Sequence, residues 1–316
     1  MGVLRQEEVI ANKVKESFAN EPGFVFEKVA GAGAFGVILR FQNKNAESSE
    51  YRTIAVKALA TLGDDGPEAK TLKLLKWARH IVTVIQIPLI SDKTMWIKYN
   101  AIITEYIENG TLMGLKQRLG QYTNPPRKLP NRVLWAIFLC LARGCVAMAY
   151  PPPGDPEKTP TSSSDQLLET IPSNIDSHPP RNLKHGDLHE GNNQDEHPIF
   201  PVLKFIDFGS ASEDEEAIEE NIEAIGTVMC ELFWEARDIN QLVNDKQGEN
   251  ILDPNLDPDL VLLTAQCVAC NPADRPSLSH LLSVIIPKTH QKYPHLPDES
   301  DRYISGLVQR TVFDAS

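Results

Sequence analysis

The sequence predicts a mixed α+β protein of bilobal form, with a small antiparallel-sheet lobe that contains one main helix and a larger, mainly helical lobe. Residues 24–58 contain short β-branched and aromatic runs separated by glycine-rich or polar turns, a pattern typical of an antiparallel meander. Beyond residue 108, apolar residues recur mostly at helical spacing. The length of 316 residues suffices for two units of roughly 150 residues.

The first part of the chain is expected to alternate helices with short strands. Apolar residues at positions 9, 10, 14 and 18 predict an amphipathic helix over residues 5–19. The β-rich runs predict strands over 24–26, 37–39 and 53–56. A helix is then expected over 67–78, followed by strands near 81–87 and 96–105.

The second part is expected to be helical, with one interruption. Helices are predicted over 112–119, 133–148, 217–235, 258–269 and 277–286. Residues 151–180 hold eight of the 23 prolines and little periodic apolar content, which predicts a mobile surface insertion. The predicted organisation is a leading helix, a sheet lobe, a helical lobe with this insertion and a C-terminal extension: 1–22, 23–107, 108–286 and 287–316.

Composition excludes several classes of protein. With 31 Lys+Arg and 43 Asp+Glu the chain has a net charge of −12, so a non-specific nucleic-acid binder is not expected. Its longest apolar stretch, 133–142, is shorter than the ~18 residues of a membrane span. Without a secretory signal, the expected location is the cytoplasm, with the nucleus left open. Cys267 and Cys270 are predicted to be buried thiols and not metal ligands.

Three glycines lie between two predicted strands, in Gly31-Ala-Gly33-Ala-Phe-Gly36-Val37. Such a turn lets backbone N–H groups approach phosphate oxygens without obstruction by a Cβ atom. The same spacing occurs in dinucleotide-binding folds, but there the third glycine opens a helix, whereas a strand is predicted here. An ordinary hairpin is the remaining alternative.

A lysine ends the apolar run Ile54-Ala55-Val56-Lys57. A lysine at the end of an apolar strand is costly unless its charge is paired. Nucleotide phosphates and the carboxylate of Glu68, at the start of the next helix, are the two candidate partners.

The strongest signal is His185-Gly-Asp187-Leu-His-Glu-Gly-Asn192, followed by Asp207-Phe-Gly. These residues supply one potential base and two oxygen ligands for a hard cation. Phosphoryl transfer requires this set of groups.

In order, residue type and spacing, these motifs resemble those of the protein-kinase-like superfamily over residues 24–286. The resemblance implies a cleft that binds ATP and Mg²⁺ and transfers the γ-phosphoryl group to a hydroxyl. By this resemblance Lys57 holds the α- and β-phosphates and pairs with Glu68, and Asp187 accepts or orients the hydroxyl proton. Asn192 and Asp207 bind Mg²⁺.

The resemblance also implies the remaining nucleotide contacts. Thr104 would be the gatekeeper, and the backbones of Glu105 and Ile107 would face the adenine. Leu72, Phe208 and His185 would stack as an internal hydrophobic spine. Further contacts are expected from the glycine-rich loop and the strands beside it: Gly31, Gly33, Gly36, Val37 and Ala55.

Several positions depart from the family pattern. Gly186 stands where regulated protein kinases have Arg, so activation by loop phosphorylation is not expected. Asn221 aligns with an Asp that anchors the catalytic loop. Arg275 lacks the family's usual Glu partner, and an acid within 213–223 is a candidate replacement. Residues 212–220, here called the acidic strip, contain six acidic residues. These charges either stabilise the N-terminus of the following helix or select a basic substrate.

The sequence leaves the identity of the phosphoryl acceptor undecided. His189 replaces a Lys common in Ser/Thr-specific kinases, and His-Gly-Asp also occurs in small-molecule kinases of the aminoglycoside and choline type. The first half of the chain is more similar to protein kinases, so a protein Ser/Thr acceptor, basic if the acidic strip selects it, is favoured over a small molecule. A catalytically weak pseudokinase scaffold is the third alternative.

Overall fold

A computed structural model of the protein describes residues 6–19, 23–33, 36–44, 51–58, 66–85, 101–122, 129–155, 157–160, 165–197, 200–233 and 255–314. Its described part is mixed α+β, with a four-stranded antiparallel sheet and eight α-helices, which confirms the predicted class. Two compact units divide the chain. The first takes its residues from Met1–Tyr106, Pro151–Leu168 and Phe208–Ala211, and the second from the remainder.

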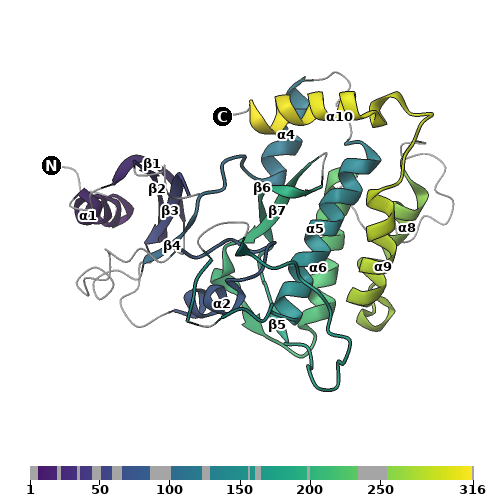
Figure 1. Ribbon diagram of the computed structural model, residues 1–316, viewed down its shortest axis with the longest axis horizontal. Helices are drawn as coiled ribbons and strands as arrows, with labels where there is room; N and C mark the ends of the chain where they lie inside the picture. Colours follow the sequence, from purple (N-terminus) through teal and green to yellow (C-terminus); the bar gives the residue numbers. More distant parts are fainter. Residues whose placement is uncertain are drawn as a thin grey trace. The chain divides into compact units, whose positions relative to one another are not determined.

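The first unit contains the sheet, in the order β1-β2-β3-β4 (Figure 1). Consecutive strands pair in antiparallel fashion, as the meander pattern predicts. The strands are β1 (Phe24–Gly33), β2 (Gly36–Asn43), β3 (Thr53–Ala58) and β4 (Ala101–Glu105). The strand expected near 81–87 is reduced, in its described part, to an antiparallel bridge of Val84 with Thr104, with backbone hydrogen bonds from Ile85 to Ile103 and from Glu105 to Thr83. Residues 86–87 lie outside the described residues. Residues 96–100 of the next predicted strand lie outside the described residues.

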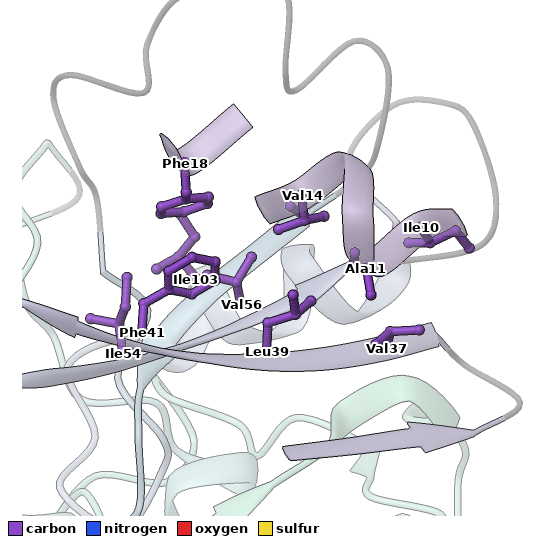
Figure 2. Packing of buried hydrophobic residues seen from close by; sticks show 12 residues of the cluster. Ile10, Ala11, Val14, Phe18, Val37, Leu39, Phe41, Ile54, Val56 and Ile103 are labelled. Atoms are coloured by element: carbon purple, nitrogen blue, oxygen red, sulfur yellow. The ribbon is translucent and has the colours of Figure 1, made fainter. Parts of the chain in front are cut away.

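Helix α1 (Gln6–Ala19) covers one face of this sheet (Figure 2). Its buried residues Ile10, Ala11, Val14 and Phe18 pack on inward-facing residues of β2, β3 and β4. The Phe18 ring stacks on Phe41, with 4.3 Å between ring centroids. The leading helix is therefore part of the core of the first unit, because the apolar residues of β2 and β3 alternate and need a cover on one face only.

Helix α2 (Pro67–Leu75) buries Glu68, Leu72 and Leu75 and contacts the short 3₁₀ turn η3 (Phe208–Ser210). Proline at its first position suits the start of a helix, since that N–H has no helical partner. The helix ends at Leu75, three residues before the predicted end. The residues that follow instead form backbone hydrogen bonds with Leu167, through Trp77 and Arg79.

The second unit is built around α5 (Asn131–Ala149), whose side chains are almost all buried. It contacts α6 (Ala217–Phe233), α9 (Leu278–Thr289) and strand β7 (Phe200–Ile206) (Figure 1). By length and hydropathy this helix meets the criterion for a membrane span, contrary to the sequence expectation. Its most apolar window is 94% buried inside the protein, as in the core helix of a globular unit.

Short strands and further helices complete the second unit. Strand β5 (Leu183–Lys184) pairs with β8 (Ser212–Glu213), and β6 (His189–His197) pairs with β7. These two ladders flank the segment 185–188 and residue 207. The remaining helices are α4 (Leu112–Tyr122), α8 (Pro258–Cys267) and α10 (Asp301–Val308).

Candidate functional site

The face of the sheet opposite α1 carries the predicted nucleotide residues of the first unit. Lys57 pairs in register with Ile38 on β2, and Ala55 pairs with Thr104 on β4. Directly opposed residues of antiparallel strands share a face, so these four side chains lie on one side of the sheet. Gly31 of β1 pairs with Ile38 of β2, so it lies beside this group of residues.

Val37 does not belong to this set. Its side chain is 1% exposed and packs in the core beneath α1, one residue out of phase with Lys57. The expectation that Val37 contacts the nucleotide is therefore wrong, because successive strand residues point to opposite faces. Ile38 takes that position instead. Counting from Gly36 in steps of two would have found it.

An ion pair links β3 to α2. The Nζ atom of Lys57 lies 2.8 Å from both carboxylate oxygens of Glu68. Only 12% of the Lys57 side chain and 8% of the Glu68 side chain are exposed. Glu68 lies in the first turn of α2, where the helix dipole stabilises a negative charge. The structure thus brings together the two charges that the sequence offered as partners.

The glycine-rich segment is the turn between β1 and β2. Gly33 and Gly36 pair across the hairpin, so the strand-turn-strand prediction is confirmed and a helix does not follow the third glycine. Gly36 has a φ of 134°, which side-chain-bearing residues rarely adopt. The tip at 34–35 lies outside the described residues.

The predicted hinge ends β4. Thr104 is half-buried on the Lys57 face. The Glu105 side chain is buried and its Oε1 accepts hydrogen bonds from the N–H and hydroxyl of Thr83, at 2.8 and 2.6 Å. This pairing fixes the end of β4 at the point where the first unit stops, because Ile107 begins the second unit.

Asp207 has a strained backbone. Its φ of 61° makes it the one residue with a side chain among the described residues that has a positive φ. Such conformations cost of order 1–3 kcal/mol and persist where the surroundings impose them. The next residue, Phe208, is fully buried and belongs to the first unit, where η3 contacts α2 and Leu72 is also buried. The strained residue therefore directly precedes a fully buried one.

The segment 185–187 is held by hydrogen bonds to its backbone and to His185. The Nδ1 atom of His185 accepts from the N–H of Asp187 at 3.3 Å, so Nε2 carries the ring proton and donates to the Ile206 carbonyl at 3.1 Å. The ring also meets Phe205 edge-on. Gly186 has a φ of 80°, which explains why a glycine stands at this position. Asp187 itself is exposed.

Asn221 on α6 anchors this segment, as its alignment predicts. Its side-chain oxygen accepts from the His185 N–H at 3.1 Å, and its amide nitrogen donates to the Leu183 carbonyl at 2.8 Å. Asn221 is 4% exposed. An Asp could accept the first bond but could not donate the second.

Asn221→Asp is therefore expected to lower the free energy of unfolding by about 1–3 kcal/mol, since a buried carbonyl loses its donor and faces a carboxylate. Urea unfolding measures the loss. The control is Asn174→Asp, because exposed Asn174 uses only its oxygen, as acceptor from Ser177. Equal stability of the two variants would contradict the anchoring role.

Arg275 has the acidic partner that the sequence left open. Its Nη2 lies 2.7 Å from Glu223 Oε2, and its other nitrogens donate to the carbonyls of Glu219 and Ala269. The Arg275 side chain is 5% exposed. The prediction that an acid within 213–223 pairs with Arg275 is thereby confirmed, with Glu223 as that acid.

The acidic strip divides into two parts. Glu213 to Glu216 are exposed, and the Asp214 side chain accepts from the Glu216 N–H within this turn. Glu219 and Glu220 lie in the first turn of α6, where their charges favour the helix. Glu220 also forms a hydrogen-bonded ion pair with Lys184. The hydrogen bond raises the pKa of the Lys184 ammonium group.

A cavity of about 640 Å³ lies within the second unit, beside the residue that follows Asp187. Its lining contains both apolar residues, including Leu188, Val228 and Leu232, and charged ones. Two of its three glutamates already have cationic partners, Lys184 for Glu220 and Arg275 for Glu223. The cavity was not predicted, because it is assembled from α4, α6 and the segment 184–188.

Asn192, the other predicted Mg²⁺ ligand, lies on β6, where it pairs with Leu203 of β7. Among the residues that the structure describes, no group of three or more His, Cys, Asp or Glu residues could hold a metal ion. Cys267 is a buried thiol, and burial raises its pKa to about 12, whereas Cys270 is exposed, which corrects the prediction for that residue.

Comparison of the chain with known proteins gives no family assignment. No protein-family model matches it, and no curated protein matches it in sequence.

Proposed function

We propose that the protein is an ATP- and Mg²⁺-dependent phosphotransferase with a bilobal protein-kinase-like fold, which transfers the γ-phosphoryl group to a Ser or Thr hydroxyl of a protein. The Lys57–Glu68 pair is the observation that carries the proposal. A nearly buried lysine held by both oxygens of a carboxylate is positioned as a fixed cation, and phosphates are ligands that such a cation binds.

Residues of this chain suit both nucleotide binding and Mg²⁺ binding. Gly31, Ile38, Ala55 and Thr104 surround Lys57 on one face of the sheet and would contact the nucleotide. Asp207, held in a strained turn, presents the carboxylate that would bind Mg²⁺ together with Asn192. The metal would neutralise phosphate charge.

Asp187 would orient the acceptor hydroxyl and take its proton. Its carboxylate is exposed, so a substrate can reach it, while its backbone is fixed through His185 and Asn221. Because positioning dominates phosphoryl transfer, a rigid loop with an accessible carboxylate suits this role.

Thermal unfolding with ATP, with and without MgCl₂, tests the nucleotide site. A ligand that binds only the folded state raises the midpoint, by roughly 5 °C at 100-fold excess over Kd. The rise is expected in the wild type with Mg²⁺ and should vanish in Lys57→Ala and Asp207→Asn. Lys28→Ala and Asp176→Asn, at exposed positions, should keep it. No rise in the wild type would refute the proposal and favour a scaffold without nucleotide.

A small-molecule acceptor is a second candidate, favoured by the cavity beside Leu188. Its volume lies in the range of small-molecule sites. Since two of its glutamates are already neutralised, it suits an amphipathic alcohol better than a polycation. Transfer of labelled phosphate to a library of Ser/Thr peptides and, separately, of small alcohols and amines distinguishes the two acceptors.

A further inference from the structure

Residues 151–155 and 165–168, here called the α2 clasp, pack against the chain directly after α2. Clasp and helix belong to the same compact unit. The sequence predicted a mobile surface insertion over 151–180. Residues 173–179 are exposed, but Gln166 is only 8% and the adjoining Glu169 0% exposed. Polar side chains make these contacts, so hydrophobic periodicity did not indicate them.

One end of the clasp holds Trp77. The indole Nε1 of Trp77 donates to the carbonyl of Asp155 at 3.1 Å. Gly154 lies against the same ring, and a Cβ atom added there would come within 2.0 Å of it. Only a glycine allows the clasp to approach the indole this closely.

The other end bonds to the backbone of residues 77–81. Leu167 exchanges two backbone hydrogen bonds with this stretch, donating to the Trp77 carbonyl at 2.7 Å and accepting from the Arg79 N–H at 3.2 Å. The side-chain amide of Gln166 donates to the carbonyls of Ala78 at 2.8 Å and Ile81 at 3.5 Å. These carbonyls lie two to six residues beyond Leu75, the last residue of α2, so the clasp holds the chain directly after the helix.

These contacts bear on the ion pair at the other end of the same helix. Helix α2 is only nine residues long, with Glu68 in its first turn and the clasp immediately beyond its last. A helix this short has little stability of its own and depends on its contacts. Rotation or fraying of α2 would withdraw Glu68 from Lys57, which the clasp resists by fixing the far end.

We propose that the α2 clasp is a positioning element that keeps Glu68 on Lys57, so that the nucleotide site is assembled in the resting protein without activation-loop phosphorylation. Gln166 and Gly154 are its key residues. The consequence for nucleotide binding rests on the proposed function, whereas the effect on α2 does not. Gly186, in place of the family's Arg, agrees with a device that needs no phosphate.

Two variants test the clasp from its two ends. Gln166→Glu removes the amide donor and sets a carboxylate against two carbonyls, and Gly154→Ala displaces the clasp from Trp77. Their controls are Gln266→Glu, which makes the same change at an exposed site, and Gly120→Ala, where an added Cβ meets nothing within 4 Å. Should Gln166→Glu fail to fold, Gly154→Ala carries the test.

Hydrogen exchange of residues 67–75 is the first measurement and needs no nucleotide. Both variants should speed exchange there about five- to tenfold, the equivalent of about 1 kcal/mol of lost hydrogen bonding, while exchange in α5 stays as in the wild type. Unchanged exchange over 67–75 in the folded variants would overturn the clasp, whether or not the protein binds ATP.

A mutant cycle with Glu68→Gln is the second measurement. If the clasp acts through Glu68, each variant should weaken Mg²⁺-ATP affinity about five- to tenfold in the wild-type background and much less in the Glu68→Gln background. Equal losses in both backgrounds would show a merely structural role and overturn the proposal. Absence of ATP binding to the wild type would refute the proposed function and leave the exchange result to decide the effect of the clasp on α2.

Discussion

Replacing Asp187 by alanine is expected to lower phosphoryl transfer by about 10²–10⁴-fold, the typical contribution of a positioned general base, and to leave nucleotide affinity unchanged. The Asp187 side chain is exposed, so its loss should not disturb the core. The hydrogen bonds that Asn221 and His185 make to this loop do not involve the Asp187 side chain, so they should persist in the variant. Single-turnover transfer and the Mg²⁺-ATP thermal shift measure the two quantities separately.

The control for Asp187→Ala is Glu215→Gln, which removes an exposed negative charge from the acidic strip. It should transfer phosphate as the wild type does if that strip only stabilises α6. Transfer at the wild-type rate in Asp187→Ala would disprove the base assignment. Loss of nucleotide affinity in the same variant would show that Asp187 serves binding and not proton transfer.

Replacing Asp257 by alanine is expected to lower the free energy of unfolding by about 3–5 kcal/mol, the cost of removing one member of a buried charged network. The Asp257 side chain is 3% exposed. It accepts hydrogen bonds from the Tyr293 hydroxyl, from the Trp135 indole at 3.1 Å and from the Asp259 N–H at 2.9 Å, and Lys288 lies 3.5 Å away. The variant would take the acceptor from the buried Tyr293 hydroxyl and the N-cap from α8, while Lys288 keeps Asp259 and the Trp135 indole keeps Tyr293 as partners.

The deficit of Asp257→Ala should depend on pH. Burial by itself raises the pKa of Asp257, but the hydrogen bonds from Tyr293, Trp135 and the Asp259 N–H, together with the charge of Lys288, hold this pKa below its usual value. A carboxyl with a lowered pKa in the folded state stabilises the protein fully above its unfolded pKa, about 4, and loses this effect as the pH falls through the folded value. The gap between wild type and variant should therefore be constant at neutral pH and shrink in acid.

Urea unfolding at several pH values from neutral to about 3 measures this gap. Asp274→Ala is the control, because exposed Asp274 has a single side-chain contact, from Asn271. It should change stability little at any pH. A gap that widens in acid would contradict the sign of the pKa shift, and a variant as stable as the control would contradict the network.

Local sequence patterns were sufficient where one physical rule decides the structure. Runs of β-branched and aromatic residues predicted β2 and β3, and helical spacing predicted α1 and α5, because both signals are local. Glu68 could be named as a candidate partner of Lys57 from the sequence, since an unpaired charge near a core is costly. Asn221 and Arg275 were found by alignment to a family pattern, and their partners required the structure.

The sequence by itself determined the α+β class and the antiparallel hairpin around the glycines, and it supplied the residues that we propose for phosphoryl transfer. Tertiary structure decided that Glu223 pairs with Arg275 and that a proline-rich segment contacts the chain directly after α2 through Gln166 and Gly154. These outcomes depend on contacts between residues far apart in the chain, made by polar groups and close backbone approach, and such contacts have no sequence period.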